Sequence, residues 1–246
     1  MATSAGAGMA RASDRTVRTL RRWLLVVIGI DLGLLAVRAA TYPAFFSMPG
    51  AASYLIAPVV ALAVYAAAIG ALPLLAARVP GASTALRVGT FVGLVGGAID
   101  MTNVTLESLL SLPQAVVTVT TGVAMLGLFL SFGVAGFLGG RRAGSFGLGL
   151  GAAVWSAVVA MLVAVTFGFV LINVALPKLA HDEIGDPDYA RSGWMDVRAF
   201  AVANTFDAGF THLVEAPIIA TVLGAAGSGL TRLGARRRPA AEHGNS

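Results

Sequence analysis

Cysteine is absent from this chain of 246 residues, and charged side chains make up only 12% of it. The lack of cysteine excludes disulfides, thiolate metal sites, iron–sulfur clusters and cysteine nucleophiles together. Soluble domains carry about 25% charged residues, so the low charge content, beside 57% hydrophobic residues, is typical of a membrane protein. The bilayer is therefore the predicted solvent of this fold.

Histidine is scarce, and this limits the metal sites that the chain can build. Of the three histidines, His181 falls in a predicted loop and His243 in the C-terminal tail, so only His212 lies in an apolar stretch. With Glu215 at i+3 it makes a weak metal motif, because a bound metal needs further ligands of this kind. We predict no bound metal and no cofactor.

Lysine occurs once, at Lys178, so arginine supplies nearly all of the positive charge. A net charge of +5 would suggest nucleic-acid binding in a soluble protein, but here the arginines flank hydrophobic stretches, where membrane topology explains them better. We expect no nucleic-acid partner. Nucleotide-binding loops, catalytic triads, helical zinc-protease motifs and kinase signatures are also missing from the sequence, which argues against ATP hydrolysis.

Six apolar stretches are long enough, or nearly so, to cross a hydrocarbon core of about 30 Å, which takes roughly 20 helical residues. They cover residues 23–40, 52–77, 88–110, 115–138, 146–176 and 200–230. The predicted fold class is an all-α integral membrane protein with six transmembrane helices. The six-helix transmembrane domain would cover residues 22–231. Disordered basic cytoplasmic tails would cover residues 1–21 and 232–246.

Arginines mark one side of the predicted membrane domain. Thirteen of them flank the helices on that side: Arg11, Arg15, Arg18, Arg21, Arg22, Arg78, Arg87, Arg141, Arg142, Arg232, Arg236, Arg237 and Arg238. Positively charged flanks face the cytoplasm, so we predict a multi-pass protein of the cell (inner) membrane with both termini inside. A cleaved signal peptide is disfavoured, because Asp31 interrupts the first apolar stretch and Arg38 occupies a cleavage-site position that needs a small residue.

Five carboxylic acids interrupt the apolar stretches. They are Asp31, Asp100, Glu107, Asp207 and Glu215. An ionisable group near the bilayer centre costs about 3 kcal/mol on insertion scales, so such groups serve packing, assembly or a function. One certain base, Arg38, cannot neutralise all five. The remainder would be balanced by protons, a small cation, a cationic substrate or water.

Helical spacing places polar residues on one face of three helices. In the first helix, Asp31 and Arg38 lie about 20° apart around the axis. The third helix carries polar residues at i, i+3 and i+7, and the sixth at i, i+3, i+7 and i+11. We expect helices one, three and six to enclose a polar cavity. The candidate proton- or substrate-binding residues are Asp31, Asp100, Asn103, Glu107, Asn204, Asp207, His212 and Glu215.

Arg38 and Glu107 would lie level near the outer surface and are predicted to form a gate or ion pair. The alternative for Arg38 is a side chain that reaches the outer headgroups. The acids could equally form a purely structural network. The loop at residues 178–198 is acidic, and it is either a solvated loop or a vestibule that gathers cations above the cavity.

Proline and glycine add two further predictions. Pro217 frees the carbonyl of Leu213 in the sixth helix, and such a carbonyl needs a partner from protein, water or an ion. Gly89, Gly93 and Gly97 let a neighbouring helix approach the third helix closely, and Gly29 and Gly33 repeat this pattern in the first helix.

Three classes of function fit these patterns. A proton- or cation-coupled transporter or permease component is favoured, with a small molecule as substrate. The second class is an intramembrane enzyme that acts on a lipid or isoprenoid through a protonated carboxylic acid, Glu107 or Asp207. The third is an assembly or regulatory subunit whose acids pair with a partner membrane protein.

Overall fold

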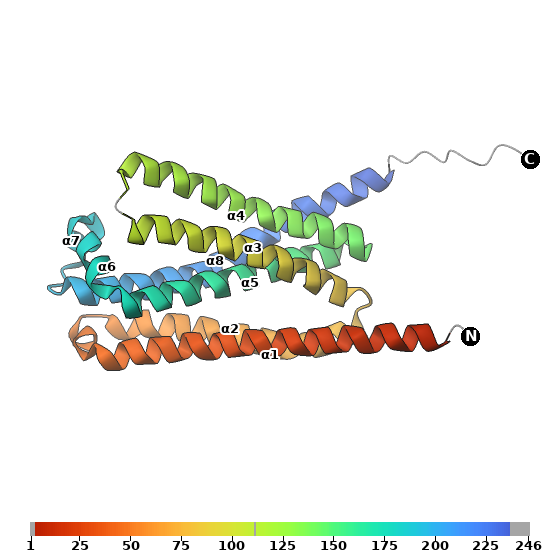
Figure 1. The fold of residues 1–246 in the computed structure, drawn as a ribbon, viewed down its shortest axis with the longest axis horizontal. Coiled ribbons are helices and arrows are strands. Elements are labelled where there is room, and N and C mark those ends of the chain that lie inside the picture. The colour runs from red at the N-terminus through yellow and green to blue at the C-terminus, as the bar shows by residue number, and fades with distance from the viewer. Residues whose placement is uncertain (1–2, 111, 237–246) are drawn as a thin grey trace, which may run out of the picture.

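The computed structural model describes residues 3–110 and 112–236, and the regular secondary structure in these ranges is entirely helical (Figure 1). The long helices are α1 (Thr3–Thr41), α2 (Ala51–Arg78), α3 (Ala82–Leu109), α4 (Gln114–Ala143), α5 (Phe146–Val174) and α8 (Val197–Arg236). The short elements are η1 (Pro43–Ser47), α6 (Leu176–Asp182), η2 (Glu183–Gly185) and α7 (Pro187–Ser192).

The six long helices match the six predicted spans. Within the described ranges, each has an apolar segment long enough to cross a membrane. This confirms the all-helical class and six helices that are long and apolar enough to span a membrane. The fifth predicted span reaches residue 176, whereas α5 ends at Val174, because α6 begins at Leu176 with a proline in its first turn.

Helix α1 is longer than its apolar segment. It begins at Thr3, inside the range 1–21 for which the sequence predicts disorder. Alanine and arginine are frequent in this range and have high helix propensity, so a helix nucleated in the apolar segment extends into it. Helix α8 continues to Arg236, and residues 237–246 of the predicted C-terminal tail lie outside the described residues.

Four helices form the central bundle, and two lie beside it. In this bundle α4 and α5 each pack against α3 and α8 and against each other, and α5 is the most buried of the six long helices. Helices α1 and α2 form a hairpin along one side of the bundle, where α1 contacts α5 and α2 contacts α8 (Figure 1). A polar site in the central bundle is therefore enclosed chiefly by α3, α5 and α8, with α4 completing the bundle.

Glycines of α3 allow a close approach to α5. A Cβ atom added at Gly89 or Gly93 would stand 2.5 Å from a backbone carbonyl oxygen of α5. At Gly97 an added Cβ would stand 2.8 Å from the Cβ of Val163. These distances are too short for a real side chain, so the glycines are required for this packing. The tight contact ends one turn before Asp100, where the two helices begin to leave space between them.

The glycine pattern in α1 has a different outcome. An added Cβ at Gly29 or Gly33 would meet no atom within 4 Å. These glycines therefore lie on an open face of α1, and the close packing predicted around Asp31 is not formed at these two positions.

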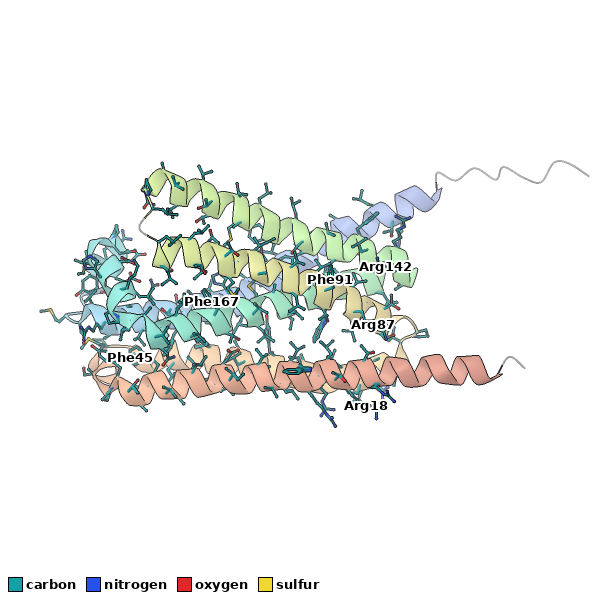
Figure 2. The ribbon with its side chains drawn as sticks, viewed as in Figure 1. Arg18, Phe45, Arg87, Phe91, Arg142 and Phe167 are labelled. Carbon is teal, nitrogen blue, oxygen red and sulfur yellow. The ribbon has the colours of Figure 1, made fainter. Side chains whose placement is uncertain are left out.

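The two ends of the bundle differ in charge. Both ends of the described chain lie at one end, together with the α2–α3 and α4–α5 connections, and Arg18, Arg87 and Arg142 are labelled there (Figure 2). We call this the arginine end. The opposite end, which we call the loop end, carries η1, α6, η2 and α7.

Candidate functional site

A cavity of about 410 Å³ lies between α3, α5 and α8, and α6 and η2 border it at the loop end. We call it the acidic cavity. Its polar lining residues are Asp100, Glu107, Ser108, Asp182, Glu183, Asp186, Asn204, Thr205 and His212. The side chains of Glu107, Asp182 and Asn204 are exposed, so the cavity reaches the surface of the protein.

Asp100 lies in the interior of this cavity. Its side chain is 2% exposed, and neither carboxyl oxygen has a hydrogen-bond partner within the part of the chain that the structure describes. Asn103, one turn further along α3, is 3% exposed, and its Oδ1 also lacks a partner there. Buried polar atoms are nearly always hydrogen-bonded, and leaving one unpaired costs about 1–3 kcal/mol. Asp100 and Asn103 therefore present unpaired polar oxygens in the interior of the described bundle.

His212 of α8 is the titratable neighbour of Asp100 on the opposite wall. Its Nδ1 lies 2.7 Å from the Ala208 carbonyl oxygen. Because a carbonyl oxygen only accepts, Nδ1 carries a hydrogen, and the neutral ring has a free lone pair at Nε2. The lining thus combines a buried carboxyl on α3 with one imidazole on α8.

The remaining walls supply no second base. The residues of α5 that line the cavity are apolar: Ala164, Val165, Gly168, Phe169 and Leu171. Among the lining residues, His212 is the one side chain that can become positively charged. The nearby Lys178 pairs with Asp182 at 3.0 Å. The charge of the cavity is thus strongly negative unless a proton or a cation enters.

Glu183 joins the loop end to α8. Its Oε1 accepts a hydrogen bond of 2.8 Å from Asn204 Nδ2. Burial raises the pKa of Glu183, and the neighbouring Asp182 and Asp186 raise it further, although the Asn204 hydrogen bond opposes the shift. The acidic loop therefore borders the cavity and contacts its α8 wall through a side-chain hydrogen bond.

Four of the eight candidate residues line the acidic cavity: Asp100, Glu107, Asn204 and His212. A fifth, Asn103, is buried one turn from Asp100 but is not part of the lining. Asp207 and Glu215 are exposed and do not line the cavity. In α8, residues 204, 208 and 212 form the row that faces it, so Asp207 lies outside this row and Glu215 lies almost one turn beyond its end.

Helix α1 does not contribute to the lining, so the predicted cavity between helices one, three and six is not confirmed. Asp31 is fully buried, and its two carboxyl oxygens have no hydrogen-bond partner within the described residues. The Thr166 hydroxyl of α5 lies beside Asp31 but donates to the Leu162 carbonyl at 2.6 Å. Helix α5 packs against both α1 and α3, which keeps Asp31 apart from Asp100.

Arg38 and Glu107 do not form the predicted gate pair. Neither residue belongs to an ion pair such as Lys178–Asp182 or Arg191–Asp188 in the part of the chain that the structure describes. Arg38 Nη2 instead donates to the Asn173 carbonyl at 2.9 Å. Asn173 Nδ2 in turn donates to the Leu34 carbonyl at 3.2 Å. Arg38 therefore ties α1 to α5, and Glu107 lies at the cavity without an ion-pair partner in the described part of the chain.

Two contacts that the sequence did not predict join the outer helices to the central bundle: Asn173 links α5 to α1, and Tyr65 links α2 to α8. Asn173 was missed because it is an isolated amide in an apolar stretch. The carbonyl of Leu213, which Pro217 frees, accepts a hydrogen bond of 2.7 Å from Tyr65 Oη of α2. Helix α8 continues through Pro217, and this carbonyl is occupied by protein rather than offered to an ion.

A third contact closes the loop end. Tyr42 Oη donates to Asp196 Oδ2 at 2.5 Å, and Asp196 Oδ1 accepts from the amides of Arg198 and Ala199 at the start of α8. Burial raises the pKa of Tyr42 to about 12, and the contact with Asp196 adds to the shift. Burial opposes ionisation of Asp196, but these hydrogen bonds outweigh it and lower the pKa of Asp196.

Comparisons with protein families, with curated proteins and with solved structures find no match for this chain. Its class is therefore defined by the fold: an all-helical protein whose six long apolar helices make it a candidate multi-pass membrane protein.

Proposed function

We propose that this protein is a multi-pass transporter or permease component coupled to protons or a small cation, and that Asp100 and His212 form its coupling site. One observation carries the proposal. Asp100 is buried without a hydrogen-bond partner among the described residues, on a cavity whose other charged groups are nearly all acidic. A group kept in this state is costly to the fold, so it serves a ligand or a proton.

The distribution of arginine supports an orientation in the cell (inner) membrane. Positive flanks favour the cytoplasm, so the arginine end and both termini would lie inside. The acidic cavity would then face the outside. Its exposed rim residue Glu107 and the acidic loop would raise the local concentration of cations at the entrance.

The coupling would follow from competition for Asp100. A cation pairs with the ionised carboxyl, and a proton neutralises it, so each occupant displaces the other. The titratable groups that face this position are His212 from α8, Glu107 from α3, and Asp182, Glu183 and Asp186 from the loop end, while α5 contributes none to the lining.

A pH-jump measurement tests this function without knowledge of the substrate. Proteoliposomes adsorbed on a supported membrane give a transient current when a protein binds protons within the membrane field. We expect such a transient for the unaltered chain and its loss in Asp100→Asn. Asp207→Asn is the matched control, because Asp207 lies on the same bundle but does not line the cavity. Equal transients in both variants would remove Asp100 from the coupling site.

The exposed acids of α8 support a second candidate, the assembly or regulatory subunit. Asp207 and Glu215 are exposed within the apolar span of α8, where a partner helix with a basic residue would neutralise them. Native mass spectrometry of the gently extracted protein tests this idea. A stoichiometric partner that is lost in the double variant Asp207→Asn with Glu215→Gln is expected, and a monomer that carries no other protein would contradict it.

A further inference from the structure

We propose that the acidic cavity binds an organic cation with an apolar body, and that the binding displaces a proton. This rests on the proposed function and deepens it, because it names the class of ligand that the cavity accepts. Four features of the cavity support it: its charge, the spacing of its acids, the chemistry of its walls and its size.

The charge of the cavity requires a positive ligand. Asp100 supplies a buried carboxyl whose two oxygens are unpaired among the described residues, and Glu107, Glu183 and Asp186 lie on the same lining. Arginine is missing from this lining, and its single basic group, His212, uses Nδ1 for the Ala208 carbonyl. An anionic ligand would find no strong donor here, whereas a cation would pair with Asp100 in a setting of low dielectric.

The spacing of the acids disfavours a bare metal ion. Among the described residues, no three acidic, histidine or cysteine side chains converge as a metal site. Divalent cations such as Mg²⁺ and Ca²⁺ require about six or more oxygen ligands close together. Asp100 instead stands apart from the other carboxyls, which suits a single positive charge that is spread over a larger group.

The walls between these acids are apolar. Val104 of α3, Leu179 of α6, and Val165, Phe169 and Leu171 of α5 all contribute to the lining. The Phe169 ring is fixed by an edge contact with Phe206, at 5.8 Å between centroids. Such walls exclude a strongly hydrated ion, but they stabilise alkyl or aromatic groups, and an aromatic ring also attracts a quaternary ammonium group.

The size of the cavity agrees with this class of ligand. A volume of about 410 Å³ lies within the range of roughly 300–1,000 Å³ that is typical of small-molecule sites. It exceeds what a single inorganic cation needs. A molecule with one ammonium centre and an aromatic or branched alkyl body would place its charge at Asp100 and its body against α5.

Proton displacement follows from the burial of Asp100. In the empty cavity this buried carboxyl, which has no hydrogen-bond partner among the described residues, is stable only when it holds a proton. When the cation pairs with the ionised carboxyl, this proton leaves through the acidic entrance to the outside water. No bond of the ligand is broken, and the net charge of the site is the same before and after the exchange.

The test uses benzyltrimethylammonium as the probe and purified full-length protein. Isothermal titration calorimetry in two buffers of different ionisation enthalpy measures the affinity and the number of protons released. We expect binding with up to one proton released per cation, and Na⁺ or Mg²⁺ at the same concentration should not compete. Asp100→Asn should weaken the affinity by at least about thirtyfold, because one partner of a buried charge pair is removed. Asp207→Asn should bind as the unaltered chain does.

Two further measurements keep the outcome interpretable. Glu107→Gln, at the exposed rim, should weaken binding less than Asp100→Asn, and neopentylbenzene, the neutral isostere of the probe, should not bind. Equal binding of the isostere would overturn the proposal, since it would show an apolar pocket without charge selection. Absence of probe binding with an intact pH-jump transient would overturn the ligand class and leave the proposed function standing. Binding without a transient would refute the function alone.

Discussion

Asp100 and Asp207 are the same residue type in two apolar helices, but their surroundings differ completely. Asp207 is exposed on α8, so it can be solvated or paired from outside the chain. Asp100 is buried in the acidic cavity and has no hydrogen-bond partner among the described residues. A buried carboxyl without a hydrogen-bond partner lowers the free energy of unfolding. Under the proposed function, Asp100 exchanges stability for binding.

This exchange predicts the direction of a stability change. Asp100→Asn keeps the size of the side chain and removes the ionisable group, so the melting temperature in detergent should be equal to or above that of the unaltered chain. Thermal unfolding followed by near-ultraviolet circular dichroism measures it. The matched change Asn173→Ala should lower the melting temperature, because it removes the side-chain hydrogen bond from α5 to the Leu34 carbonyl. A marked loss of stability in Asp100→Asn would mean that Asp100 serves the fold.

At the scale of the helices, the sequence predicts where each helix lies in the chain, but it does not predict which helices pack side by side. Length and hydropathy are properties of one segment, which is why the six spans and the glycine contact of α3 agree with the structure. The partner of a polar face depends on which helix lies next to it. Arg38 faces α5 and bonds to the Asn173 carbonyl, and nothing in the spacing of α1 distinguishes this from a contact with Glu107. The predicted faces of α3 and α8 meet at the cavity only in part, because Asp207 and Glu215 of α8 are exposed and do not line it.

The contact between α2 and α8 makes a second prediction. Tyr65 Oη donates to the Leu213 carbonyl, which lacks its helical donor because residue 217 is proline. Tyr65→Phe should lower the free energy of unfolding by about 1 kcal/mol. In a Pro217→Ala background the amide of residue 217 satisfies the same carbonyl, so Tyr65→Phe should cost less. A double-mutant cycle by reversible unfolding in detergent measures the difference. Equal costs in both backgrounds would show that the two residues act independently.

The start of α8 predicts an acid-dependent component of stability. The folded state lowers the pKa of Asp196 below its ordinary value of 3.8, through hydrogen bonds from Tyr42 and from the amides of Arg198 and Ala199. A lowered pKa contributes stability above the unfolded value, and this contribution is lost as the pH falls through the folded value. The unaltered chain should therefore lose more stability than Asp196→Asn when the pH is lowered from about 5 to about 3. Asp188→Asn, an exposed control in α7, should follow the unaltered chain, and parallel pH profiles for all three would contradict this assignment.

At the scale of the whole molecule, charge and cavity give one direction to the bundle. The arginine end carries both ends of the described chain, and the loop end carries the acidic residues that border the cavity. The glycine contact of α3 and α5 lies on the arginine side of Asp100, and the cavity lies on the loop side. The half on the arginine side is closed by tight helix packing, and the half on the loop side holds the acidic cavity. This arrangement suits uptake of a cation from the loop end.

The absence of cysteine makes this direction measurable, because a single introduced thiol can be labelled without background. Ser47→Cys in η1 and Ser145→Cys between α4 and α5 are matched probes, since both side chains are exposed and they lie at opposite ends of the bundle. If the arginine end is cytoplasmic, a membrane-impermeant maleimide should label Ser47→Cys in spheroplasts, in which the inner membrane is intact. It should label Ser145→Cys only after that membrane is permeabilised. The reverse pattern would place the acidic cavity on the cytoplasmic side, and the cation would then enter from within the cell.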